Sequence, residues 1–163
     1  MTKLRLTDWA SLAEIVGAVG VVISLIYVGV QVSANTDEIR ATNRQQLIGR
    51  AHSATTGASR NPELAVVFAK LSEGKELTPA EMIQYGYFVR ALVYDVQEAF
   101  LLMEEGRLDE AYWKTRAALF STYVSQEPAR DIYERDKEIG LLHERFVVWA
   151  DSELNNRYGL NDR

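Results

Sequence analysis

The chain has 163 residues, of which 47% are hydrophobic, and its 18 Lys and Arg against 23 Asp and Glu give a net charge of -5. This length suits one compact domain with an appendage. The absence of cysteine excludes disulfides, thiolate nucleophiles and cysteine-ligated metal sites, and the lack of any basic run longer than two residues argues against nucleic-acid binding.

Residues 1–8 form a short flank, and the first predicted element is a helix over residues 9–34. Its stretch 15–32 carries no charge and extends roughly 27 Å at ~1.5 Å per residue, close to the ~30 Å of a hydrocarbon core. We therefore expect a single transmembrane helix in contact with the lipid bilayer. The alternatives are a buried core helix and a signal peptide, in which Lys3 and Arg5 would precede the apolar segment.

Small and polar residues recur at spacings of three and four along this helix, which places them on one face. The members of this face, called the seam below, are Ala13, Gly17, Gly20, Ser24, Tyr27 and Gln31. Small side chains let helix backbones approach closely in lipid, and a period of 3.5 favours left-handed supercoiling around a like helix. The seam therefore predicts self-association. The alternative is that Gly and Ala are simply frequent in transmembrane helices.

Glu14 is the one ionisable residue next to the apolar stretch. A carboxylate there is costly unless it reaches the interface, pairs or takes a proton. Its position near the start of the helix favours an interfacial carboxylate, which also suits the helix dipole; an intramembrane ion or proton site is the alternative. Basic residues flank the apolar stretch on both sides, so their count leaves the orientation open.

Residues 35–60 are predicted to extend the anchor helix or to form a linker, with Asn35-Thr36 as a candidate break. Small and apolar residues keep a helical spacing through this stretch, and no proline interrupts it. Residues 61–163 are predicted to form a helical bundle domain.

Start and stop signals divide that domain into helices. The predicted boundaries are Asn61-Pro62 to Gly74, the capping box Thr78-Pro79-Ala80-Glu81 to Gly106, Asp109 to Pro128, and 129–155 with a bend or break at Gly140. No alternating strand pattern occurs. The fold class is therefore all-α: an N-terminal transmembrane helix continuing toward a small antiparallel helical bundle.

Few residues point to chemistry. His52 is isolated, and His143-Glu144 is interpreted as an exposed helical pair, because neither histidine has metal-ligand spacing. The carboxylates around Gly106 either hold a divalent cation or, as we favour, form a solvated turn; they are Glu98, Glu104, Glu105, Asp109 and Glu110. Six tyrosines are expected in core and rim packing: Tyr85, Tyr87, Tyr94, Tyr112, Tyr123 and Tyr133. Nucleophile and nucleotide-binding motifs are missing, so we expect no enzyme and no catalytic, cofactor-binding or metal residues.

Several segments resemble a widespread group of uncharacterised bacterial single-pass membrane proteins. The resemblance rests on residues 9–36, with Ala13-Glu14-Ile15 and the run from Val22 to Tyr27, and on Gly106-Arg107-Leu108-Asp109 followed by Trp113. It implies an N-terminal transmembrane helix in the bacterial inner membrane and a helical C-terminal domain, cytoplasmic rather than periplasmic. It implies no activity.

These observations favour a non-enzymatic, membrane-anchored helical protein that assembles with itself or serves as a subunit of a larger membrane complex. The alternative is a homo-oligomeric pore lined by Ser24 and Gln31, with Glu14 at one mouth. A third hypothesis is an anchored receptor whose domain binds a small ligand among its tyrosines.

Overall fold

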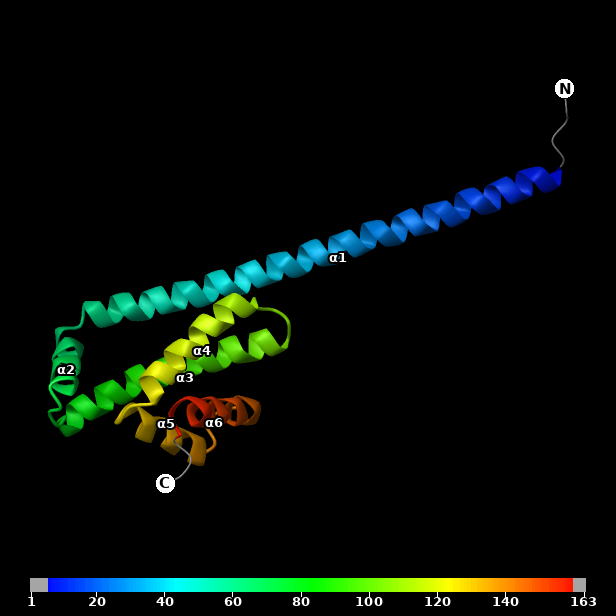
Figure 1. Ribbon diagram of the computed structural model, residues 1–163. Helices are drawn as coiled ribbons and strands as arrows, with labels where there is room; N and C mark the ends of the chain where they lie inside the picture. The colour runs from blue at the N-terminus through cyan, green and yellow to red at the C-terminus, as the bar shows by residue number, and fades with distance from the viewer. Residues whose placement is uncertain (1–5, 160–163) are drawn as a thin grey trace. The chain divides into compact units, whose positions relative to one another are not determined.

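The computed structural model describes residues 6–159, with side chains at all of these positions except 6–8, 54 and 58. Within that range it contains six helices and no strand, which confirms the all-α fold class (Figure 1). The chain divides into two compact units, one up to Ile39 and one from Arg40 onward. Lys3 and Arg5 lie outside the described residues.

The N-terminal unit is the first part of helix α1 (Leu6–Ser59). Of the described helices, α1 alone is long and apolar enough to cross a membrane, and none of its most apolar window is buried within the protein. The predicted break at Asn35-Thr36 is wrong, because both residues are helical. The Thr36 hydroxyl donates to the Val32 carbonyl one turn earlier at 2.9 Å, a bond that lets threonine stay inside a helix.

The C-terminal unit comprises residues 40–59 of α1 and five further helices. These are α2 (Pro62–Ser72), α3 (Pro79–Glu104), α4 (Glu110–Val124), α5 (Ala129–Glu138) and α6 (Glu144–Tyr158). The structure thus groups residues 40–59 with the helices that follow them, whereas the boundary predicted from the sequence falls after residue 60.

The predicted start at residue 129 matches α5, which has no side-chain cap, and the other three predicted helix starts are confirmed by their hydrogen bonds. The Asn61 side-chain oxygen accepts from the Glu63 backbone N–H at 3.0 Å. At the capping box the Thr78 hydroxyl accepts from the Glu81 N–H, while the Glu81 carboxylate accepts from the Thr78 N–H at 2.8 Å. Asp109 caps α4 through the Tyr112 N–H at 2.8 Å. Each cap satisfies backbone donors that a helix start leaves unpaired.

The stops predicted at glycines are confirmed as well, whereas α4 ends at Val124, four residues before the predicted end at Pro128. A glycine in the left-handed region follows each of α2, α3 and α5: Gly74, Gly106 and Gly140, with φ of 67, 68 and 74°. Glycine adopts this region without steric clash because it has no Cβ atom. Gly140 therefore marks a true break between α5 and α6. Helix α6 extends to Tyr158, three residues beyond the predicted end.

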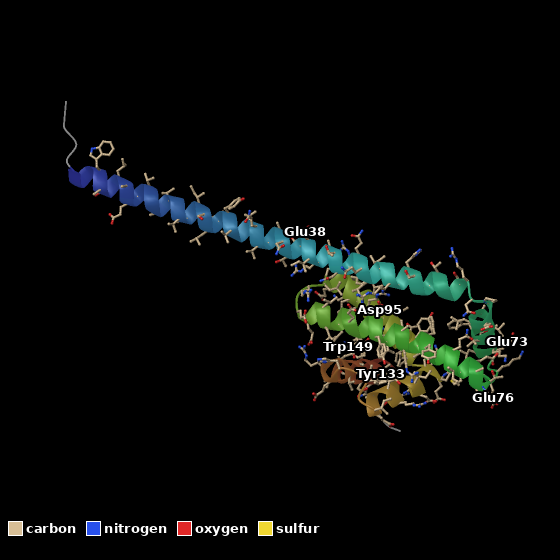
Figure 2. The ribbon with its side chains drawn as sticks, turned by 180° about the vertical axis from the view of Figure 1, so that it is seen from behind. Glu38, Glu73, Glu76, Asp95, Tyr133 and Trp149 are labelled. Atoms are coloured by element: carbon tan, nitrogen blue, oxygen red, sulfur yellow. The ribbon has the colours of Figure 1, made fainter. Side chains whose placement is uncertain are left out.

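The core of the C-terminal unit is an aromatic cluster between α3, α4 and α6 (Figure 2). The Trp113 and Trp149 rings meet edge to face with centroids 4.7 Å apart, and Phe100 stacks on Trp149 at 5.6 Å. Phe120 and Phe146 are fully buried beside them, with centroids 5.6 Å apart. Aromatic pairs of this geometry add about 0.5–1.5 kcal/mol each beyond their burial.

Two buried polar contacts fix α5 against its neighbours. The Arg90 guanidinium of α3 donates three hydrogen bonds to Asp136, whose side chain is only 2% exposed, at 2.7, 2.8 and 3.1 Å. The Tyr133 hydroxyl donates to Asp151 of α6 at 2.8 Å, and burial, followed by this carboxylate, raises the pKa of Tyr133 well above its usual value. Both contacts pair the polar groups that packing of α5 takes out of water.

Candidate functional site

The predicted seam lies on the N-terminal unit, and the structure places all six of its residues on one helix with exposed side chains. At about 100° per residue they fall within an arc of roughly 80°. They form one continuous stripe of small and polar surface that no other described part of the N-terminal unit covers. Glu14 lies about 100° around the helix from Ala13 and so stands beside the seam rather than in it.

No contact among the described residues requires the glycines of the N-terminal unit. A Cβ atom added at Gly17, Gly20 or Gly29 would meet no described atom within 4 Å. Glycine in a helix interior lowers helix stability by about 1 kcal/mol relative to alanine. No packing contact among the described residues offsets this loss. Close approach of a second helix is the usual reason for such residues in lipid.

Two seam residues satisfy each other's polar groups. The Gln31 side-chain amide donates to the Tyr27 hydroxyl at 2.8 Å, one helical turn away. This bond reduces the cost of placing an amide near hydrocarbon, where an unmade hydrogen bond is expensive. The two interpretations of Glu14, an interfacial carboxylate or an ion or proton site, stay predictions.

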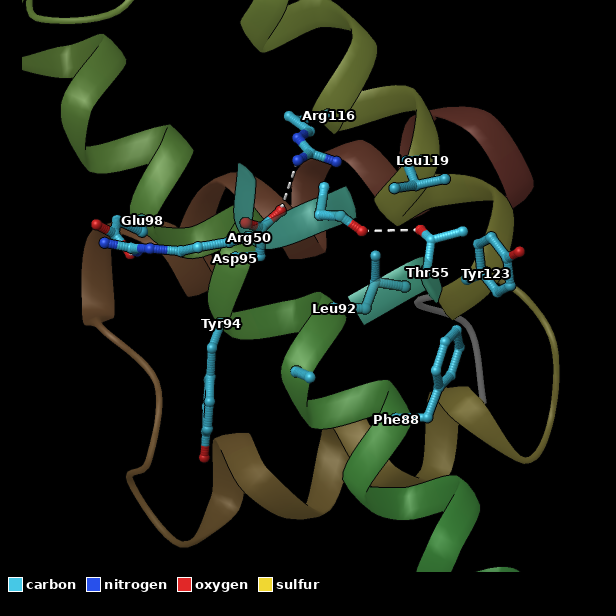
Figure 3. Close-up of a pocket in the computed structure, with 12 residues that line it drawn as sticks. Arg50, Thr55, Phe88, Leu92, Tyr94, Asp95, Glu98, Arg116, Leu119 and Tyr123 are labelled. Atoms are coloured by element: carbon cyan, nitrogen blue, oxygen red, sulfur yellow. Dashed lines mark hydrogen bonds and ion pairs between the residues drawn. The ribbon is translucent and has the colours of Figure 1, made fainter. Parts of the chain in front are cut away.

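A second candidate site lies in the C-terminal unit, and its position and charged residues were not predicted from the sequence. A cavity of about 430 Å³ opens between residues 50–55 of α1, α3 and α4 (Figure 3). Its lining is Arg50, Ala51, Thr55, Phe88, Ala91, Leu92, Tyr94, Asp95, Glu98, Arg116, Leu119 and Tyr123. Most of these side chains are apolar or aromatic, with a few charged groups, and the volume falls within the roughly 300–1,000 Å³ of small-molecule sites.

An ion pair lies at the deep side of this cavity. Arg116 of α4 contacts Asp95 of α3, with Nη2 3.1 Å from Oδ2 and side-chain exposures of 10% and 16% (Figure 3). The same Nη2 donates to the Leu47 backbone carbonyl of α1 at 3.3 Å. Arg116 thereby connects the three helices that enclose the cavity, and its guanidinium also stands 5.2 Å from the centre of the Tyr112 ring.

The pair is incompletely hydrogen bonded. Asp95 Oδ1 and Arg116 Nε are buried and have no hydrogen-bond partner among the described residues. Burial raises the pKa of the Asp95 carboxyl, and the neighbouring Arg116 charge only partly opposes this rise. An unsatisfied buried polar atom costs about 1–3 kcal/mol, and such atoms in a native fold often mark a functional role.

The mouth of the cavity carries a second, exposed ion pair and two aromatic rings. Arg50 of α1 pairs with Glu98 of α3, and both side chains are about half exposed. Phe88 and Tyr123 form part of the opposite wall, with ring centroids 6.2 Å apart. Tyr94 also lines the cavity and is 39% exposed. Two positive and two negative side chains therefore line a largely apolar space.

The tyrosines divide between core and surface. Tyr85 and Tyr133 are buried, and Tyr112 is half-buried, as expected for packing. Tyr87 is 68% exposed, so the interpretation as packing is wrong for it.

The carboxylates around Gly106 contact basic side chains instead of one another. The pairs are Glu98 with Arg50, Glu104 with Arg145, Glu105 with Arg107, Asp109 with Arg44, and Glu110 with Lys114. No group of three acidic or histidine ligands that could hold a metal occurs in residues 6–159. This arrangement fits the interpretation of a solvated turn.

The two histidines make separate local contacts. His52 is exposed on α1, with Nε2 3.5 Å from the Thr56 hydroxyl. His143 is not a helical residue: it is the N-cap of α6, where its Nδ1 accepts from the Arg145 N–H at 3.2 Å. The expected helical pair His143-Glu144 is therefore wrong, because a ring nitrogen can replace the usual capping oxygen.

The sequence did contain a weak signal for the cavity. Arg116 stands at helical spacing between Trp113 and Phe120, and Asp95 between Leu92 and Ala99. Charged residues on an apolar helix face are rarely buried unless paired. That pattern indicates a buried ion pair but does not say which residues pair.

Comparison with protein-family models, with curated proteins and with solved structures finds no match for this chain. The resemblance of residues 9–36 and of the Gly106 segment to single-pass bacterial proteins therefore stays a prediction.

Proposed function

We propose that this chain is a non-enzymatic, membrane-anchored helical protein whose N-terminal helix crosses the bilayer once and associates with a second copy of itself. Its C-terminal unit then folds in water. The resemblance of residues 9–36 to single-pass bacterial proteins supports the inner membrane as the location and the cytoplasm as the side of the C-terminal unit.

The observation that carries this proposal is the apolar surface of the N-terminal unit. Between Trp9 and Val32, fourteen large apolar residues each expose more than half of their surface. At about 1.5–3 kcal/mol for burying one such side chain, covering all of them would stabilise the protein by on the order of 20 kcal/mol. A contiguous apolar surface of this extent is typical of a region that lipid or protein covers.

The seam supports self-association as the way in which one face is covered. Hydrocarbon provides no hydrophobic drive between helices, so close packing of small residues and hydrogen bonds hold them together. Gly17 and Gly20 supply the small surface, and neither is needed inside the chain. The remaining faces carry the large aliphatic residues and suit lipid.

Three glycine substitutions test this proposal in a matched way. Gly17→Leu and Gly20→Leu block the seam, whereas Gly29→Leu places the same side chain about 160° around the helix from Ala13. All three positions are free of internal contacts, so folding of the chain is expected to be unaffected. Because the protein has no cysteine, Glu76→Cys, on the exposed segment between α2 and α3, gives one labelling site.

The full-length labelled protein is reconstituted in liposomes, and energy transfer between donor and acceptor copies is measured against lipid dilution. We expect the seam variants to weaken association at least tenfold and Gly29→Leu to match the parent. Equal association of all three variants, or no energy transfer from the parent, refutes self-association through the seam. Ion flux across the same liposomes tests the pore alternative.

A further inference from the structure

We propose that the cavity between α1, α3 and α4 binds a neutral amphipathic molecule, with an apolar body and a hydroxyl or amide head group that meets the Asp95–Arg116 pair. This inference is independent of self-association, since it concerns the C-terminal unit alone. It specifies the chemistry of the small ligand that the receptor hypothesis from the sequence left unspecified.

The apolar lining determines the body of the ligand. Phe88, Leu92 and Leu119 supply aliphatic and aromatic surface. Ala91 lies in the wall with its small side chain exposed, so it takes up little of the space. Taking roughly 30 Å³ for each non-hydrogen atom, the share of a water molecule in the liquid, the 430 Å³ cavity holds about 14 such atoms. A short alkyl chain or a small ring system has this size.

The charges determine the head group. Arg116 is paired with Asp95, and Arg50 with Glu98, so the lining is balanced. An anionic ligand would face both carboxylates, and a cationic one both guanidinium groups. Either ion would meet as many attractive as repulsive charges and would also lose its own hydration, which is costly in a partly buried site. A neutral molecule avoids this cost.

The unsatisfied atoms specify the polarity of the head group further. Arg116 Nε can only donate a hydrogen bond, and the ionised Asp95 carboxylate can only accept one. A hydroxyl or a primary amide carries a donor and an acceptor on one small group and can serve both. Both protein atoms are covered in this structure, so contact with the head group requires a small turn of the Asp95 and Arg116 side chains, and the terminal torsion of an aspartate is soft.

The test uses three ligands with the same eight-carbon chain: octanamide, octanoate and octylammonium. Their binding to full-length protein in lipid nanodiscs is measured by calorimetry, with empty nanodiscs subtracted because the chains also enter lipid. We expect the dissociation constant of octanamide to be at least tenfold lower than that of either ion. Equal affinities, or tightest binding of an ion, would overturn the proposal.

Two variants separate cavity binding from entry into lipid. Ala91→Phe fills the cavity from α3, and its matched control Ala111→Phe adds the same ring on the exposed surface of α4, away from the lining. We expect the first to abolish the preference for octanamide and the second to keep it. If Ala91→Phe does not fold, Thr55→Trp fills the cavity from α1. A filled cavity that binds octanamide like the parent contradicts the proposal.

Discussion

Replacement of Leu47 by alanine tests how residues 40–59 of α1 are held in the C-terminal unit. Leu47 is 1% exposed and is the one buried residue among the described side chains of α1. Its neighbour Ile48 is 49% exposed. Ile48→Ala therefore removes an aliphatic group of similar size from a position outside the core. The two substitutions form a matched pair at adjacent positions.

Several other contacts of this segment are polar. Arg40 Nε donates to the Gly106 carbonyl at 2.8 Å, Asn43 to the Arg107 carbonyl at 3.0 Å, and Arg44 to Asp109 at 3.1 Å. Exposed bonds of this kind contribute about 0–1 kcal/mol each. The Leu47 side chain is therefore the largest single contribution that we expect from this segment.

For Leu47→Ala we expect a loss of about 3 kcal/mol in the free energy of unfolding, since buried Leu→Ala changes cost roughly 2–5 kcal/mol including the cavity left behind. The bond from Arg116 to the Leu47 backbone carbonyl survives the change, so the loss reports packing alone. For Ile48→Ala we expect less than about 0.5 kcal/mol, as for other surface substitutions.

Urea unfolding of the full-length protein, followed by tryptophan fluorescence, measures the difference. Trp9→Phe is included in every variant, so that the signal comes from Trp113 and Trp149 in the core. A loss of about 3 kcal/mol shifts the midpoint by roughly 1–3 M urea. Equal losses for the two variants, or a loss below about 1 kcal/mol for Leu47→Ala, would show that residues 40–59 do not pack as described.

Two further predictions concern the polar contacts of the C-terminal unit. Asp136→Asn leaves the Arg90 guanidinium with a neutral partner, and we expect a loss of about 3 kcal/mol; urea unfolding that changes by less than about 1 kcal/mol would contradict it. The pKa of Glu81 lies near 2, below its usual 4.5, because Lys70 and then Thr78 donate hydrogen bonds to it. The ionised Glu81 carboxylate therefore contributes its full share to the free energy of unfolding above about pH 4.5, and this share is lost as the pH falls toward about 2. The difference in unfolding free energy between the parent and Glu81→Gln should shrink over that range. A difference that does not change with pH would refute this.

Helix boundaries were predictable because their causes are local. The Asn61 cap, the Thr78–Glu81 capping box and the left-handed Gly106 each act within a few residues of the chain. The break expected at Asn35-Thr36 was wrong for a related reason: short polar side chains can end a helix, but they can also bond back to it, as Thr36 does.

The contacts that build the cavity were not predictable from the sequence. Asp95 and Arg116 come from different helices, and their meeting depends on how α3 and α4 cross. Leu47 and Ile48 are similar apolar neighbours, and only the rotation of α1 in the C-terminal unit decides which of them is buried. Periodicity indicates which face of a helix is apolar but not which partner that face meets.

The seam was predictable in part. Its spacing was visible in the sequence, and the structure confirms that its residues share one exposed helix face. In our proposal a second copy of the chain covers this face, and the packing within one chain does not specify that partner.

The central claim is that residues 9–34 cross a membrane, and labelling of single cysteines in sealed vesicles tests it most directly. The positions are Lys3→Cys in the flank, Val22→Cys on the face opposite the seam, and Glu76→Cys in the C-terminal unit. With a membrane-impermeant maleimide, we predict that Val22→Cys stays unlabelled and that the other two react from opposite sides of the bilayer. Labelling of Lys3→Cys and Glu76→Cys from the same side, or reaction of Val22→Cys as fast as Glu76→Cys, would contradict the claim.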